Sequence, residues 1–171
     1  MTTLHVSLMK KSIHIILSVV VVLLLAWRFY ASLIWSQAWE HYEAGGGVFV
    51  KSQLNEKEMT QALEDFRRHY KISPLSTKSR NYAGKALIRL GRYKEAIKEF
   101  DRSLSIRSTF TAHYRKAFAL MKLERFYEME ESLEAAYKHH KDFDSHVRFT
   151  EEFGHMKDHP SMSKFRKQFK G

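Results

Sequence analysis

Hydrophobic residues are concentrated near the start of the chain, in a run at residues 12–35 that contains a single charge, Arg28. Two lysines, Lys10 and Lys11, come directly before this run. A helix of about 20 apolar residues, rising about 1.5 Å each, is long enough to cross a hydrocarbon core of about 30 Å. The pattern predicts a transmembrane helix at residues 12–35, after a cytoplasmic N-terminus at residues 1–11.

Two other interpretations of this run stay open. A cleaved signal peptide has the same basic start and apolar middle, and Ser36-Gln37-Ala38 is an acceptable cleavage site, although it lies well beyond the purely apolar stretch that ends at Trp27. A soluble protein would need to enclose the helix, because the unbroken valines and leucines at residues 19–25 offer no polar face. An uncleaved, membrane-spanning helix fits the pattern best.

Arg28 is the unusual residue of the run. Together with Trp27 and Tyr30 it is typical of the membrane–water boundary, where an arginine head group reaches lipid phosphate. If the apolar core instead extends to Trp35, Arg28 lies inside it and requires an acidic partner on another membrane subunit. The predicted anchor and its interface comprise Lys10, Lys11, Trp27, Arg28, Tyr30 and Trp35.

The charges that flank the run predict its orientation. Basic residues precede it, whereas the stretch after Trp35 carries Glu40 and Glu43 and no Lys or Arg before Lys51. Because cytoplasmic flanks are enriched in Lys and Arg, we expect the N-terminus in the cytoplasm and the rest of the chain on the outer, periplasmic or extracytoplasmic side. The chain contains no cysteine, which is compatible with an oxidising compartment.

A second pattern recurs further along the chain with a period of 33 residues. Small and large apolar residues return at the same offsets, at Leu90, Tyr93, Ala96, Phe100 and Leu104 and then at Leu123, Phe126, Met129, Leu133 and Tyr137. An upstream copy is marked by Ala62, Phe66 and Pro74. Two helices packed as an antiparallel hairpin need small residues where their backbones approach and large residues between, so the pattern predicts repeated helical hairpins and an all-α fold.

This pattern is similar to the tetratricopeptide repeat, a helix–turn–helix unit of about 34 residues. The resemblance covers residues 42–141 and implies a short α-solenoid of about three hairpins, with the recognisable repeats at residues 58–141. Residues 36–57 would supply a juxtamembrane segment and a degenerate first helix. The three glycines at residues 45–47 disfavour a helix interior and indicate a hinge or a close backbone contact.

Residues 142–171 follow the repeats and are predicted to form capping helices. Pro160 is placed to open a last helix, in which Phe165 and Phe169 share one face among lysines and arginines. A stack of repeats exposes an apolar end, and an amphipathic segment of this kind would cover it.

Motifs that indicate catalysis are absent: the chain has no cysteine, no Gly-x-Ser-x-Gly, no phosphate-binding glycine loop and no His-Glu-x-x-His. We therefore expect neither enzymatic activity nor a cofactor. The chain has 10 histidines, but their spacings match no standard metal site, so a histidine–metal protein is a less favoured alternative. The histidines considered are His139, His140, His146, His155 and His159.

The net charge of the chain indicates which kinds of partner it could bind. The first 50 residues hold three basic and two acidic residues, a net charge of +1, so residues 51–171 carry +9 of the total of +10. Their basic residues are interleaved with Asp and Glu, and no nucleic-acid-binding motif is present, so nucleic acid is not the expected partner. Anionic membrane lipid or an acidic protein segment fits better.

The resemblance also implies where a protein partner binds, because the first helices of such repeats line a concave groove. The groove positions of the family correspond here to Lys78, Asn81, Lys85, Arg89, Tyr114, Phe118 and Lys122. Such a surface combines basic groups with an aromatic shelf and suits a peptide that carries acidic residues. The carboxylate clamp of some family members is not reproduced, since Tyr82 and Thr111 occupy two of its positions.

Three hypotheses follow for the function. The first is a single-pass membrane protein whose repeat domain is an interaction scaffold, acting as an assembly factor or accessory subunit of a membrane or envelope complex. The second is a structural subunit that its transmembrane helix holds in a larger membrane complex. The third, with the least support, is the histidine–metal protein.

Overall fold

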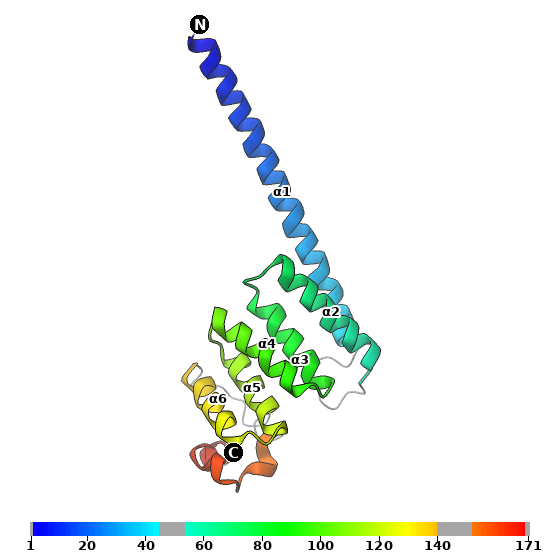
Figure 1. Cartoon of the computed structure of the whole chain (residues 1–171), viewed down its shortest axis with the longest axis vertical. Helices are drawn as coiled ribbons and strands as arrows, with labels where there is room; N and C mark the ends of the chain where they lie inside the picture. Colours follow the sequence, from blue (N-terminus) through cyan, green and yellow to red (C-terminus); the bar gives the residue numbers. More distant parts are fainter. Residues whose placement is uncertain (1, 45–53, 140–151, 170–171) are drawn as a thin grey trace.

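The structure, a computed structural model, describes residues 2–44, 54–139 and 152–169. Within these ranges it consists of helices and turns and has no β-strand, which confirms the predicted all-α class. The first helix, α1 (Thr2–Ala44), extends far beyond the rest of the molecule, with the N-terminus at its free end (Figure 1). The other helices form a layered domain that begins at the C-terminal part of α1 and extends to one side of it (Figure 1).

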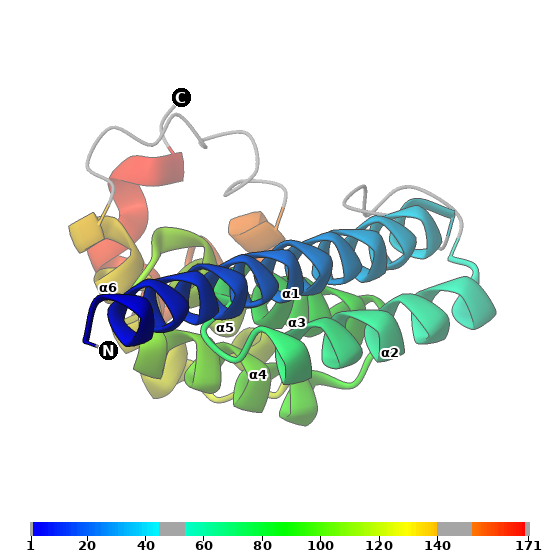
Figure 2. The same ribbon diagram turned by 90° about the horizontal axis from the view of Figure 1, so that it is seen from above.

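Helical hairpins follow one another along this domain. Its helices are α2 (Glu56–Ile72), α3 (Thr77–Arg89), α4 (Tyr93–Ile106), α5 (Phe110–Lys122), α6 (Phe126–His139) and the 3₁₀ helices η1 (Gly154–Met156) and η2 (Pro160–Phe169). α2 packs on the C-terminal part of α1, α3 on α4 and α5 on α6, while α2 with α3 and α4 with α5 join neighbouring hairpins. Figure 2 shows α2 and α4 along one side of the domain, with α1 and α3 across from them. This is a repeat-like packing of antiparallel pairs.

Individual residues explain where the helices begin and end. Asn55, Ser76 and Thr109 precede α2, α3 and α5, and each side chain accepts a hydrogen bond from a backbone N–H in the first turn. Gly91 follows α3 with a φ of 71°, and Glu124 follows α5 with a φ of 58°, in the equivalent position 33 residues later. Both hairpins therefore turn through a left-handed residue, which is the usual end of a helix.

Each hairpin is closed by small residues opposite large ones. Gly84 of α3 lies against the ring of Phe100 of α4, and a Cβ atom at Gly84 would stand 2.6 Å from two carbons of that ring. Of the repeated positions, Ala96, Phe100, Met129 and Leu133 are fully buried. The others, Leu90, Tyr93, Leu104, Leu123, Phe126 and Tyr137, are half-buried and pack against the same core. The burial of these positions confirms the register of the repeat.

The first hairpin differs from the sequence prediction. Residues 36–44 continue α1 without a break, and the part of α1 that packs on α2 begins earlier, near Ala31. The buried positions of this part are Ala31, Ile34, Ala38 and Tyr42. Because they recur every three or four residues, they form one apolar stripe on the helix that leaves the apolar run. The predicted span and the first repeat thus share one helix, and the glycines at residues 45–47 lie outside the described residues.

The described C-terminal residues pack on the last hairpin. Phe153 is fully buried, with its ring centroid 5.6 Å from that of Tyr114 on α5, and the ring of Phe165 lies 5.7 Å from that of Tyr137 on α6. After Pro160 the chain forms a 3₁₀ helix instead of the expected α-helix. The side chain of Phe169 and the residues that connect α6 to this segment lie outside the described part.

Candidate partner-binding face

Five aromatic rings meet where α1, α2 and α3 pack together. Tyr82 of α3 is at the centre, and its ring centroid lies 5.5 Å from that of Trp35, 5.2 Å from Trp39, 5.5 Å from Tyr42 and 5.5 Å from Phe66. Tyr42 and Phe66 are buried, whereas the other three rings are half-buried and reach the surface. Ring pairs of this kind contribute beyond the burial of their area, so the cluster joins α1 to α2 and α3.

Two lysines of α3 lie over these rings. Lys78 Nζ is 4.5 Å from the ring centroid of Trp35, and Lys85 Nζ is 4.2 Å from that of Tyr82. A cation within about 6 Å of a ring face is attracted by the ring quadrupole. We call the surface formed by Trp35, Trp39, Lys78, Tyr82 and Lys85 the aromatic–lysine face.

The aromatic–lysine face combines positive charge with ring surface that is open on one side. Burial raises the pKa of Tyr82, and the charge of Glu43 raises it further, so its hydroxyl stays neutral and serves as a hydrogen-bond group. The lysines can pair with carboxylates, while the rings can pack on an apolar side chain. The arrangement therefore suits recognition of a polypeptide and carries no nucleophile with an adjacent base.

Three further groove residues predicted from the sequence lie at different depths. Asn81 is 9 % exposed and is held between the helices, whereas Arg89 is half-buried and Lys122 is exposed. Lys122 Nζ lies 5.3 Å from the ring centroid of Phe118, so a lysine-over-ring pair recurs on α5. The predicted lysines of the groove thus reach the surface, and the predicted asparagine does not.

Tyr114 and Phe118 were expected to form an aromatic shelf for the partner, but the structure covers them. Tyr114 is 2 % exposed and Phe118 9 % exposed, because the ring of Phe153 packs on both, at centroid distances of 5.6 Å and 6.2 Å. A buried ion pair holds this segment in place, with Arg115 Nη1 2.7 Å from Glu152 Oε1. The chain itself therefore occupies the third-hairpin part of the predicted groove.

The predicted anchor residues separate into two groups. Trp27, Arg28 and Tyr30 are exposed on the part of α1 that projects from the domain. Trp35 is not at the end of the exposed apolar stretch, as the sequence suggested, because its ring packs on Phe66 at a centroid distance of 5.4 Å inside the aromatic cluster.

α1 has the length and composition of a membrane span. Residues 12–44 are long and apolar enough to cross a bilayer, and none of their most apolar stretch is buried within the molecule. Lys10 and Lys11 precede this stretch on the same helix, and their side chains lie outside the described part. The structure is thus compatible with a span, and it contains no membrane.

Comparison with known families identifies the kind of hairpin that α3 and α4 form. Residues 79–110 match the tetratricopeptide repeat. The match begins in the first turn of α3, runs through α4 and ends at the start of α5, so it includes both the Gly84–Phe100 contact and Lys85. Curated proteins gave no match to the chain. Tetratricopeptide repeats typically mediate protein–protein contacts and are not catalytic, which agrees with the chemistry of the aromatic–lysine face.

Sequence reasoning missed part of this face. The repeat pattern assigns no role to Trp39, and it marks Tyr82 only as a departure from the carboxylate clamp of other tetratricopeptide repeats. A signal was present, because Trp35, Trp39 and Tyr42 are spaced at i, i+4 and i+7 and so share one side of a helix. This side of the helix becomes apparent only when the apolar run and the first hairpin are one continuous helix, as α1 is.

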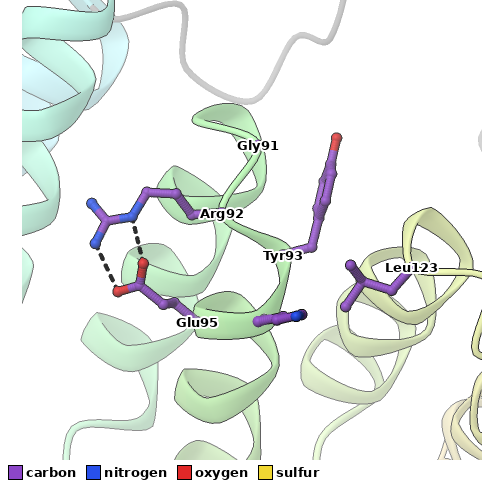
Figure 3. Close-up of a pocket in the computed structure, with 6 residues that line it drawn as sticks. Gly91, Arg92, Tyr93, Glu95 and Leu123 are labelled. Atoms are coloured by element: carbon purple, nitrogen blue, oxygen red, sulfur yellow. Dashed lines mark hydrogen bonds and ion pairs between the residues drawn. The ribbon is translucent and has the colours of Figure 1, made fainter.

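A shallow pocket lies at the turn between α3 and α4, beside the end of α5 (Figure 3). Its volume is about 270 Å³, and its lining is Gly91, Arg92, Tyr93, Lys94, Glu95 and Leu123. Figure 3 shows Tyr93 and Leu123 on one side and Arg92 turned toward Glu95, with Arg92 Nε 2.6 Å from Glu95 Oε1. The charges of Arg92 and Glu95 neutralise each other, and the pocket brings together no recognisable catalytic group of side chains.

The described residues contain no group of three or more His, Asp or Glu side chains that could hold a metal ion. His155 is exposed, and His159 Nδ1 lies 2.7 Å from Ser161 Oγ in a local hydrogen bond. The other histidines considered in the sequence, which are His140, His146 and the side chain of His139, lie outside the described part.

Proposed function

We propose that this chain is a single-pass membrane protein whose tetratricopeptide-repeat domain binds a protein partner and serves as an assembly factor or accessory subunit of a membrane or envelope complex. The observation that supports this most strongly is the aromatic–lysine face. It places two cations, Lys78 and Lys85, over rings of the first two hairpins. A face of this kind binds acidic groups through the lysines and an apolar anchor through the rings.

The membrane part of the proposal rests on α1. Its apolar side chains from Ile13 to Tyr30 are all exposed, although a soluble protein normally buries a surface of this size. The lysines before the span favour a cytoplasmic N-terminus, so the repeat domain would lie on the outer side. We propose residues 1–11 as the cytoplasmic segment and residues 152–169 as part of the cap that closes the repeats.

The partner would be a segment of another protein that carries acidic residues beside an apolar side chain. Charge attraction steers such a segment to the face, and burial of the apolar group against the rings slows its release. Because Phe153 covers Tyr114 and Phe118, we place the binding site on the first two hairpins and on Lys122 rather than along the whole predicted groove.

The experiment that tests this proposal is co-purification of the tagged full chain in mild detergent, followed by mass spectrometry of the bound proteins. Replacement of Lys85 and Lys122 by Glu should reduce the recovered partner several-fold, and the loss should shrink as salt shortens the Debye length below about 8 Å. The matched control is Lys94→Glu with Lys98→Glu, which reverses two exposed lysines on α4. A partner that the control pair releases and the face variant retains would refute the assignment of the face.

The alternative, a structural subunit held by its membrane helix, has one observation in its favour. Arg28 is exposed on α1 next to the apolar stretch, and a charge at that position can pair with an acidic group of a neighbouring membrane subunit. In that case Arg28→Leu should release the stoichiometric partner, whereas the Lys85 and Lys122 variant should keep it. The same co-purification separates the two functions.

A further inference from the structure

The two ends of the repeat domain differ in charge. At the end between α2 and α3, residues 67–80 include five basic residues and no acidic residue. At the opposite end, the basic residues of the turns are paired locally, Arg92 with Glu95 and Arg125 with Glu128. Residues 67–80 therefore carry a larger excess of positive charge than the described turns at the opposite end.

Not all of that charge is available to a ligand. Arg67, Arg68 and Arg80 each approach a carboxylate of a neighbouring turn or helix, at 3.5 Å, 3.5 Å and 3.9 Å. Lys71 and Lys78 are exposed and make no ion pair with the residues that the structure describes. Lys78 belongs to the aromatic–lysine face, so Lys71 is the cation that distinguishes this end.

The same end exposes an apolar side chain. Outside α1, the described part of the chain has two large apolar side chains that are strongly exposed, Leu75 at 81 % and Tyr127 at 74 %. Leu75 is in the turn between α2 and α3, four residues after Lys71, whereas Tyr127 is at the start of α6, at the opposite end of the domain. We call residues 68–76, which include Lys71 and Leu75, the α2–α3 corner.

The packing of α1 on α2 determines where along the axis of α1 the α2–α3 corner lies. The two helices are antiparallel, with His41 Nδ1 2.7 Å from Glu58 Oε2 near the end of α1 and the ring of Trp35 5.6 Å from that of His69. α2 continues for three residues beyond His69, a rise of about 4.5 Å. The end of α2 is therefore level with about Ser32 of α1, and the α2–α3 corner extends from there toward the turn of α1 that precedes Ala31. In Figure 1 the α2–α3 turn lies beside α1 where that helix leaves the domain.

That turn of α1 is where the buried positions end and the exposed apolar stretch begins. Arg28 is in it, three residues before Ala31 and seven before Trp35, so it shares the side of α1 that faces α2. Arg28, Lys71 and Leu75 consequently lie on the same side of α1, with Lys71 about 3 Å beyond His69 and Arg28 about 10.5 Å beyond Trp35 along the helix axes. There is no linker between the apolar stretch and the domain, because α1 is continuous to Ala44.

We propose that the α2–α3 corner docks on the surface of the membrane that α1 crosses, with Arg28 and Lys71 binding the phosphates of anionic lipid and Leu75 inserted among the head groups. This inference rests on the proposed function, in which α1 spans a bilayer. The occupant is lipid because the continuous helix holds the corner at the boundary of the apolar stretch. Cations near an anionic leaflet are attracted within a Debye length, and apolar side chains beside them enter the interface.

The chain has no cysteine, so a single probe can report on the corner. The full chain would be reconstituted with an environment-sensitive dye at Leu75→Cys or, as the matched control, at Tyr127→Cys. The vesicles would contain phosphatidylcholine alone or phosphatidylcholine with phosphatidylglycerol. Quenching by lipid that carries a nitroxide near its head group measures contact of each site with the membrane.

We expect the probe at position 75 to be quenched much more strongly in the anionic vesicles, and the probe at position 127 to be equally accessible to water in both. Lys71→Glu should lower the ratio of docked to free corner about fivefold or more, because one basic residue near an anionic surface changes that ratio by about this factor. The control Lys94→Glu, at the opposite end of the domain, should leave it unchanged.

Flotation of the vesicles separates failure of this inference from failure of the proposed function. If the chain does not float with either lipid, the membrane span itself is refuted. If it floats and position 75 is quenched no more than position 127, or equally in both lipids and independently of Lys71, the lipid docking of the corner is refuted while the anchor stands. Protection of position 75 only in native membranes would instead identify an acidic protein as the occupant.

Discussion

The two halves of α1 are parts of one unbroken helix in two different environments. Between Ile13 and Tyr30, every large apolar side chain is exposed, with exposed fractions from 45 % to 74 %. Between Ala31 and Ala44, four apolar residues are buried, among them Tyr42, which is 1 % exposed. Glu40 and Glu43 of the same part are exposed to solvent. The backbone is the same in both halves, so only the order of the side chains leaves one half exposed and packs the other into a hairpin.

The difference shows how little is needed to join a candidate membrane span to a helical hairpin. The first half lacks any polar face, and the second half alternates apolar and polar residues with the period of a helix. Because helix geometry does not depend on which solvent surrounds it, the chain needs no linker where the environment changes. The predictions below test each half against the other, from the largest expected effect to the smallest.

The largest effect is expected from charges placed in the exposed half. Leu23→Asp with Leu24→Asp should remove the protein from the membrane fraction, because each aspartate near the centre of a span costs about 3 kcal/mol. Alkaline extraction of membranes, followed by immunoblotting, measures this. The matched variant Ser36→Asp with Gln37→Asp changes exposed residues of the second half and should stay in the membrane. Loss of both variants from the membrane would mean that the halves are not separate in function.

The second prediction concerns the packed half. Tyr42→Ala removes a buried ring that contacts Phe66 and Tyr82, and it should lower the free energy of unfolding by about 3–5 kcal/mol. Phe100→Ala in the next hairpin should cost a similar amount. Trp27→Ala, in the exposed half, should change it by less than about 0.5 kcal/mol. Urea unfolding of the full chain in detergent gives these values, and a cost below about 1 kcal/mol for Tyr42→Ala would contradict the packing of α1 in the hairpin.

A smaller effect should distinguish neighbouring positions of the packed half. Ala38 is fully buried and Gln37 is exposed. Ala38→Leu should therefore destabilise the domain by about 1–3 kcal/mol through overpacking, and Gln37→Leu should be close to neutral. The measurement is again urea unfolding. Equal effects at the two positions would show that the assigned face of α1 is wrong.

The smallest effect is expected from pH at the junction between the halves. Burial lowers the pKa of His69 below its ordinary value of 6.5, where its ring lies against Trp35 and its Nδ1 is 2.6 Å from Ser79 Oγ. The unfolded chain then binds more protons than the folded chain just below pH 6.5, so stability should fall as the pH drops from 6.5 through the folded pKa.

His69→Gln should remove this dependence on pH, whereas His155→Gln, at an exposed position, should keep it. Thermal unfolding of the full chain between pH 5 and 8, the range in which histidine ordinarily changes charge, measures the difference. A stability that rises toward low pH, or that loses its pH dependence in the His155 variant, would contradict the role of His69.

Much of this protein is determined by its sequence alone. The spacing of Ala96 and Phe100, and of Met129 and Leu133, predicted paired helices, and these positions are fully buried. The composition of residues 12–30 likewise specified a helix without a polar face, since valine and leucine in unbroken succession leave nothing for water to bind. Such features are local, and local periodicity is sufficient to predict them.

Only the tertiary structure decided where the first repeat begins and which groove residues stay open. Tyr114 matches a surface position of the family pattern, yet Phe153 covers it, because that contact joins residues far apart in the chain. In the sequence, Trp35 is the last residue of the apolar run. In the structure it is part of the hairpin, because its ring packs on Phe66 of α2 and Tyr82 of α3. A periodic pattern fixes which side of a helix is apolar, whereas the identity of the surface that covers that side is set by contacts between distant segments.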